Sequence, residues 1–147
     1  MKLVIASDHA GFLLKKGLLR FLQNSGHEVR DFGTDSEESM DYPDTIIPAA
    51  REVASGKAER GIIICGSGIG ASIVANKIPG IRAAFCSDRY DAKYSRLHND
   101  ANIIALAARK MNEDKAVEIL IKWFSTGFEG GRHQRRLDKI REAEAGG

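Results

Sequence analysis

Residues 61–70 read Gly-Ile-Ile-Ile-Cys-Gly-Ser-Gly-Ile-Gly, and this stretch decides the fold. An apolar run that ends in Cys65 is typical of a parallel strand buried on both faces. The glycine-rich turn after it leads into an apolar segment, Ala71 to Ile78, that suits a helix. Because ligands bind at the carboxyl ends of the strands in an open α/β sheet, this strand–turn–helix unit is a candidate binding site.

The turn itself favours an anion, because its backbone N–H groups and the N-terminus of the following helix concentrate positive charge. The same field would favour the thiolate form of Cys65 and make it usable as a base or a nucleophile. The alternative is a buried cysteine before an ordinary strand–helix turn. The stretch alone leaves both interpretations open.

Strand and helix patterns alternate along the chain. The predicted strands are Lys2–Ser7, Glu28–Phe32, Gly61–Cys65, Ile81–Cys86 and Asn102–Leu106. The first predicted helix carries Leu14, Leu18, Phe21 and Leu22 on one face, and the others cover Thr45–Ser55, Ala71–Ile78, Asp88–Leu97 and Asn112–Phe124. This order predicts an α/β fold: a Rossmann-like, doubly wound sheet of five parallel strands with flanking helices. Residues 1–147 would form a single domain. An extra, basic C-terminal helix adds no strand and could pack across a partner subunit or remain solvated.

Composition excludes several classes of protein. A chain of 147 residues with 43% hydrophobic and 29% charged residues is typical of a globular domain, and a net charge of +2 predicts neither nucleic-acid nor membrane binding. We see no signal peptide or membrane-spanning segment, and two cysteines are too few for a disulfide framework, so we expect a cytoplasmic protein with free thiols. A bridge between Cys65 and Cys86 stays open if their strands are neighbours.

Three further groups of residues could carry chemistry. Asp8 and His9 follow the first strand, at the sheet edge expected to hold Cys65, where they could bind a ligand or simply cap a helix. His98 ends the fourth helix and could be a general acid–base or a surface residue stabilised by the helix dipole. Arg132 and Arg136 share one helical face, which suits either a phosphate clamp or a solvated basic surface.

Known nucleotide and metal motifs do not fit the chain. There is no Gly-Lys-Ser/Thr of a P-loop, and position 71, where a thiol phosphatase loop needs arginine, holds Ala71. No histidine and cysteine pair has zinc spacing. A formal dinucleotide fingerprint begins at Gly66, with Asp88 downstream, but it follows the third strand rather than the first, which makes it a weak signal.

Taken together, the chain resembles the type B ribose-5-phosphate isomerases, in the wider family that includes galactose-6-phosphate isomerase subunits. The motifs that carry the resemblance span nearly the whole chain and are Ser7–Gly11, Asp41–Pro43, Ile64–Gly70, Ala75–Lys77, Gly80–Ala83, His98–Asp100 and Glu129–His133. The resemblance implies a Rossmann-like domain, a homodimer or homotetramer with sites shared between subunits, and neither metal nor organic cofactor.

The resemblance also implies roles for individual residues. Cys65 matches the catalytic base and His98 the residue that opens the furanose ring. The implied substrate and phosphate contacts are Asp8, His9, Tyr42, Gly66, Ser67, Gly68, Ile69, Gly70, Asn99, Arg109, Arg132 and Arg136. Ser67 departs from the threonine of many members but keeps the hydroxyl group.

The predicted function is therefore an aldose–ketose isomerase that interconverts ribose 5-phosphate and ribulose 5-phosphate through an enediolate. Its partners would be a small sugar phosphate and further copies of the chain. Arg109, Arg132 and Arg136 would complete a phosphate site whose Cys65 belongs to the neighbouring subunit. Two alternatives stay open: an isomerase of a six-carbon sugar phosphate such as allose or galactose 6-phosphate, and a non-catalytic module that binds a sugar phosphate or nucleotide.

Overall fold

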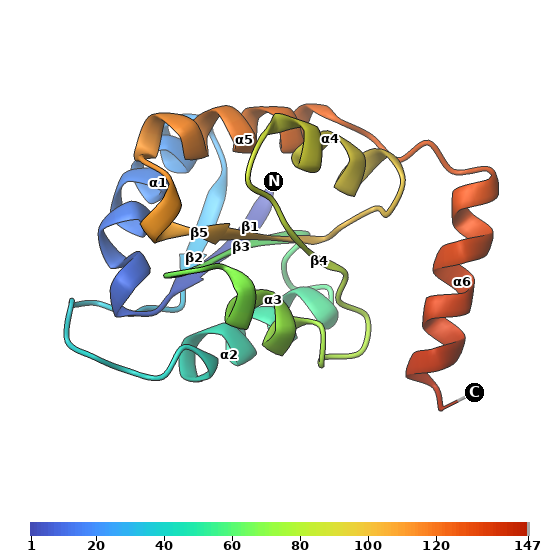
Figure 1. Ribbon diagram of the computed structural model, residues 1–147, viewed down its shortest axis with the longest axis horizontal. Coiled ribbons are helices and arrows are strands. Elements are labelled where there is room, and N and C mark those ends of the chain that lie inside the picture. Colours follow the sequence, from blue (N-terminus) through green and yellow to red (C-terminus); the bar gives the residue numbers. More distant parts are fainter. Residues whose placement is uncertain (147) are drawn as a thin grey trace.

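The computed structural model describes residues 1–146 as one parallel β-sheet with helices on both faces (Figure 1). The strands run in the order β2-β1-β3-β5-β4. They are β1 (Lys2–Ser7), β2 (Glu28–Asp31), β3 (Arg60–Cys65), β4 (Ala83–Phe85) and β5 (Ile103–Ala107). The helices are α1 (Phe12–Asn24), α2 (Pro43–Ala54), α3 (Ile69–Ala75), α4 (Arg89–Leu97), α5 (Glu113–Ser125) and α6 (Arg132–Glu144), with short 3₁₀ turns η1 (His9–Gly11) and η2 (Ala108–Lys110). The predicted fold class is confirmed.

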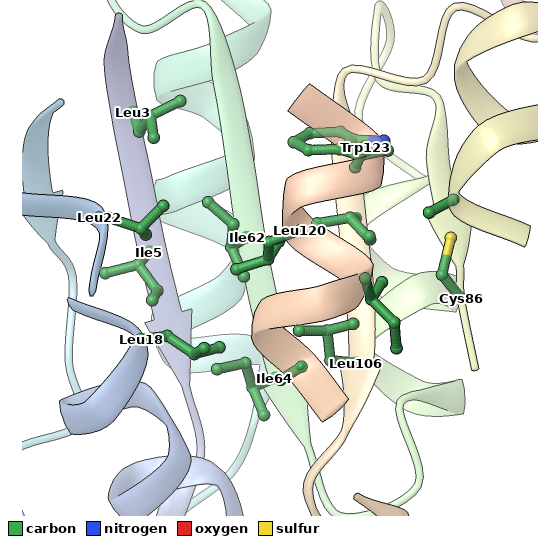
Figure 2. Packing of buried hydrophobic residues seen from close by; sticks show 14 residues of the cluster. Leu3, Ile5, Leu18, Leu22, Ile62, Ile64, Cys86, Leu106, Leu120 and Trp123 are labelled. Atoms are coloured by element: carbon green, nitrogen blue, oxygen red, sulfur yellow. The ribbon is translucent and has the colours of Figure 1, made fainter. Parts of the chain in front are cut away.

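Alternation along the central strands sends side chains to two separate cores. Ile62 and Ile64 of β3 face the core beneath α1, α4 and α5, in which Trp123 is fully buried (Figure 2). Ile63 and Cys65 face the opposite core, beneath α2 and α3. Since both faces are covered, β3 is apolar at nearly every position, as a buried parallel strand requires.

The edge strand β4 is shorter than its apolar sequence suggests. The sequence predicts a strand over residues 81–86, but the structure keeps only Ala83–Phe85. The backbone N–H of Arg82 donates instead to the side-chain oxygen of Asn102, at 2.8 Å. This bond to a side chain takes the place of a backbone hydrogen bond between strands at the start of β4. The hydrophobic periodicity of the sequence does not reveal such a replacement.

Gly17 lies within α1, where glycine is normally unfavourable. The structure explains it, because a Cβ atom on Gly17 would clash with the carboxyl group of Glu113. Glu113 begins α5, so the absence of a side chain at Gly17 allows α1 and α5 to approach closely.

The last helix, α6, stands beside the sheet rather than on either face (Figure 1). Among its described residues only His133 and Leu137 are buried. A cavity of about 600 Å³ separates its last two turns, at Ile140 and Glu144, from β4. The predicted extra helix is thus present. Within residues 1–146, no helix is both long and apolar enough to cross a membrane.

Candidate functional site

Cys65 is the last residue of β3 and lies at the carboxyl edge of the sheet. Its side chain is buried, and its Sγ atom accepts a hydrogen bond of 3.2 Å from the backbone N–H of Gly68. The neighbouring strands end at the same level: Ala107 of β5 pairs with Cys65, and Ser7 of β1 pairs with Ile64. Residues that follow β1, β3 and β5 therefore converge around the thiol.

The turn between β3 and α3 is closely covered by side chains from elsewhere in the chain, among them Arg109 and Tyr42. A Cβ atom on Gly66 would lie 2.8 Å from the guanidinium of Arg109. One on Gly70 would lie 2.6 Å from the ring of Tyr42. Each side chain therefore rests against the backbone of the turn, which explains why both positions are glycine. Inside the turn, the hydroxyl of Ser67 accepts the N–H of Ile69 at 3.2 Å.

Asp8 and His9 also lie at this edge, as the sequence predicts. The Asp8 carboxylate is 7% exposed and accepts the N–H of Gly11 at 3.1 Å, so it does cap η1. His9 uses Nδ1 to accept the N–H of Met40 at 3.2 Å. That bond ties the acidic loop after β2 to the site and leaves the hydrogen of a neutral His9 ring on Nε2.

His98 lies at the opposite edge of the sheet. It follows α4 and precedes β5, whose first residue Ile103 pairs with Gly61 and whose last pairs with Cys65. The rise from Ile103 to Ala107 is about 13 Å. Asn99 lies beside His98, and the helix that begins at Arg132 and carries Arg136 starts at this end (Figure 1). One chain therefore does not bring these four residues to Cys65.

Arg109 differs from the sequence-based grouping with Arg132 and Arg136. Its backbone N–H donates to the carbonyl of Gly66 at 3.0 Å, and its guanidinium covers the same glycine. The reason is that η2 continues directly from β5, whose carboxyl end is adjacent to that of β3. Arg109 thus belongs to the group around Cys65 in its own chain.

The turn that carries His98 and Asn99 is held by two arginines that sequence reasoning did not single out. Asp100 has a left-handed φ of 46°, which is unusual outside glycine. Arg96, which is buried, donates to the Asp100 carboxylate at 2.9 Å and to the carbonyl of Ala101 at 2.7 Å. Arg82 donates to the carbonyls of Asn99 and Asp100 at 3.0 Å each. The sequence offered no signal for this turn, because aspartate can adopt the left-handed conformation but is far more often found in others.

Glu129 and His133 meet His98 at this edge. The rings of His98 and His133 stack with centroids 4.2 Å apart and planes 15° apart. Glu129 lies between their Nε2 atoms, 4.0 Å from His98 and 3.7 Å from His133. Burial, and next the charge of His98, lower the pKa of His133. Sequence reasoning noted both residues only as part of a family motif.

Among residues 1–146, this trio is the one group of His, Cys, Asp and Glu side chains close enough to share a metal, with ligand atoms within 4.8 Å of one another. Zinc would need nitrogen lone pairs that converge on a point about 2 Å from each ring. The lone pairs of two nearly parallel rings run side by side instead. The arrangement therefore fits ring stacking and hydrogen bonding better than a shared ion.

Cys86 takes no part in the site. It lies in the core beneath α4 and α5, on the sheet face opposite to Cys65, and β5 separates their two strands. Both cysteines are free, so the bridge that the sequence left open is not formed. Burial raises the pKa of the Cys86 thiol to about 12, which keeps it protonated and unreactive near neutral pH.

The chain is similar to known proteins over nearly its whole length. Residues 3–140 match the family model described as Ribose/Galactose Isomerase. The chain is 44% identical to ribose-5-phosphate isomerase B of Escherichia coli, over 97% of this chain and 96% of that protein. The Clostridium thermocellum ribose-5-phosphate isomerase B structure superposes with a TM-score of 0.98 at 51% identity, covering 99% of each chain. A Mycoplasma genitalium ribose-5-phosphate isomerase B with bound ribulose 5-phosphate has a TM-score of 0.94 at 36% identity, covering 98% of this chain and 96% of that one.

Proposed function

This chain belongs to the ribose/galactose isomerase family, and from that premise we propose that it interconverts ribose 5-phosphate and ribulose 5-phosphate. Family membership makes it a sugar-phosphate isomerase, the class of enzyme that the sequence predicts. The choice of a five-carbon substrate rests on the relatives named ribose-5-phosphate isomerase B, which match this chain over nearly its full length.

The observation that carries the proposal is the hydrogen bond from the Gly68 N–H to the Cys65 sulfur at the carboxyl edge of the sheet. This donor points at the sulfur that would act as the base in the proposed reaction. The thiolate removes the proton from C2 of the open-chain aldose, a proton passes from the C2 hydroxyl to the C1 oxygen of the enediolate, and the Cys65 thiol then protonates C1 to give the ketose. N–H groups of the glycine-rich turn stabilise the negative charge that develops on the enediolate oxygens.

The second half of the site comes, in this proposal, from a neighbouring copy of the chain. His98 would open the furanose ring by moving a proton between the ring oxygen and the C1 hydroxyl. Arg132 and Arg136 would bind the phosphate, with Asn99 against the sugar. The distance between the two sheet edges supports this assembly, because Cys65 and His98 must both reach one small molecule. Asp8, His9, Tyr42 and Arg109 would line the half that holds Cys65.

Isotope exchange tests the proposal. The enzyme should move deuterium from solvent into ribose 5-phosphate and ribulose 5-phosphate, whereas a binding module would take up the sugar without exchange. The same assay should include allose 6-phosphate, galactose 6-phosphate and D-erythrulose 4-phosphate, because a relative at 41% identity is named D-erythrulose-4-phosphate isomerase. Faster exchange into one of these sugars would reassign the substrate and leave the reaction class intact.

A further inference from the structure

The His98 ring is held between two other rings. The ring of His133 stacks on it with the ring centroids 4.2 Å apart. The ring of Tyr94, one helical turn earlier on α4, has its centroid 4.9 Å from that of His98, and the two planes are tilted by 58°. The His98 side chain is only 37% exposed, although it lies at a helix end. Two ring neighbours restrict its rotation about both side-chain torsions, which a surface histidine would not need.

A backbone hydrogen bond holds Glu129 beside this pair of histidines. Its own N–H donates at 3.0 Å to the carbonyl of Leu97, the residue directly before His98. Arg96 fastens the same segment by donating to the carbonyl of Thr126 at 3.3 Å. The Glu129 carboxylate is thus delivered to the Nε2 edge of both histidines. A shift of about 1 Å would close its 4.0 Å approach to His98 into a hydrogen bond.

His133, which stacks on His98, is almost fully buried. It is 5% exposed, and its buried Nε2 atom has no hydrogen-bond partner among residues 1–146, which costs free energy and calls for an explanation. The Glu129 carboxylate lies 3.7 Å from this atom. Its burial disfavours a positive charge, so it can stack against a protonated His98 without like-charge repulsion. The cations on its own helix, Arg132 and Arg136, act in the same direction.

We propose that Glu129 and His133 are positioning residues for His98. Glu129 accepts the hydrogen on Nε2 of His98 and so fixes the ring orientation, which leaves Nδ1 for the sugar. His133 is the flat surface that holds the plane of the ring. The inference rests on the proposed ring-opening role of His98, and it assigns the two residues no contact with the substrate.

Substitutions at Glu129 separate positioning from a merely structural contact. Glu129 is 49% exposed, so Glu129→Ala should fold. It should lower kcat on ribose 5-phosphate, which is mostly a closed ring, by roughly tenfold, because misplacing a catalytic group by about 1 Å has effects of that order or larger. KM should change by less than about twofold, and deuterium exchange into open-chain ribulose 5-phosphate should stay near wild type. Glu129→Gln should recover most of the loss, since its side-chain oxygen can accept the same hydrogen bond.

The matched control is Asp138→Ala, which removes an exposed carboxylate from α6, the helix that carries His133, where Asp138 accepts a hydrogen bond from Gln134. It should leave all three measurements unchanged. At the stack, His133→Phe should retain most activity because the ring is kept, and His133→Ala should resemble Glu129→Ala. Equal loss in the Phe and Ala variants would overturn the role of His133 as a flat support.

Ring-nitrogen NMR provides a readout that does not depend on the isomerase reaction. In the wild-type protein the signals of His98 should show hydrogen on Nε2, and Glu129→Ala should remove that preference. Wild-type behaviour of Glu129→Ala in both NMR and kinetics would overturn the inference. A wild-type protein that shows the NMR preference but no exchange with any sugar phosphate would instead overturn the proposed function and leave the contact between Glu129 and His98 standing.

Discussion

Within one chain, Cys65 and His98 lie at opposite ends of the strands, Cys65 at their carboxyl ends and His98 at their amino ends. Cys65 pairs with Ala107, the last residue of β5, whereas His98 precedes the first residue of that strand. A base and a ring-opening acid must both come within hydrogen-bond reach of the same small sugar. In the proposed mechanism the two residues would therefore come from different copies of the chain.

Replacing Cys65 with alanine should abolish both isomerisation and solvent exchange while the sugar phosphate still binds. The reason is that the variant removes the only group at the carboxyl edge proposed to accept the carbon-bound proton. Exchange measured by NMR and binding measured by calorimetry would check this. The control is Cys86→Ala, which lies on the other sheet face and should keep most activity. Substantial exchange in Cys65→Ala would rule out a thiolate base.

Cys86 should make the protein less stable at high pH. Its pKa is raised from 9.0 to about 12 by burial, so the unfolded chain releases this proton before the folded chain does. The associated stability is complete below about pH 9 and is lost as pH rises toward 12; at pH 10.5 the loss should be roughly 2 kcal/mol. Urea unfolding at pH 8 and 10.5 should show a smaller decline for Cys86→Ala than for wild type. Equal declines would contradict the buried, protonated thiol.

Gly68→Ala should damage the turn beside Cys65 more than a positive φ alone explains. Gly68 has φ of 75°, and a Cβ atom there would lie 2.6 Å from the ring of Phe85. Gly80 offers a matched control, because it has φ of 92° but its nearest neighbour would be 4.0 Å away. We expect Gly68→Ala to lose about 1–3 kcal/mol more stability than Gly80→Ala, measured by urea unfolding, together with most activity. Similar losses of stability in both variants would show that the Phe85 ring moves to accommodate the added methyl group.

His98→Ala should slow the reaction of ribose 5-phosphate more than that of ribulose 5-phosphate. The aldose must first open its ring, whereas ribulose 5-phosphate cannot close a five-membered ring through its phosphorylated C5 oxygen. Single-turnover measurements in the two directions would separate the steps. If exchange into the open-chain ketose slowed as much as ring opening, His98 would have another role.

The sequence was sufficient for the β1 boundaries, the parallel sheet and the placement of Asp8 and His9 near Cys65, because hydrophobic runs and the carboxyl-edge rule are local signals. It did not reveal that β5 lies between β3 and β4, since strand order depends on which crossovers pack best. That order places Arg109 beside Gly66 in the same chain rather than with Arg132. The proximity of Glu129 and His133 to His98 was equally hidden, because it depends on the segment before α6 passing the end of α4, where the Glu129 N–H donates to the Leu97 carbonyl.

The shared site can be tested by mixing inactive chains. A Cys65→Ala chain combined with an Arg136→Ala chain should regain activity, because half of randomly formed dimers are mixed and each has one intact site. Full exchange of subunits would restore about a quarter of the wild-type sites. Cys65→Ala combined with Arg109→Ala should restore nothing, because both changes fall in the half that one chain supplies.

The most direct measurement is therefore the isomerase rate of refolded one-to-one mixtures of these variants, with mixed dimers verified by native mass spectrometry. The account predicts recovery for Cys65→Ala with Arg136→Ala and none for Cys65→Ala with Arg109→Ala. No recovery in the first mixture, although mixed dimers form, would contradict a site built from two chains.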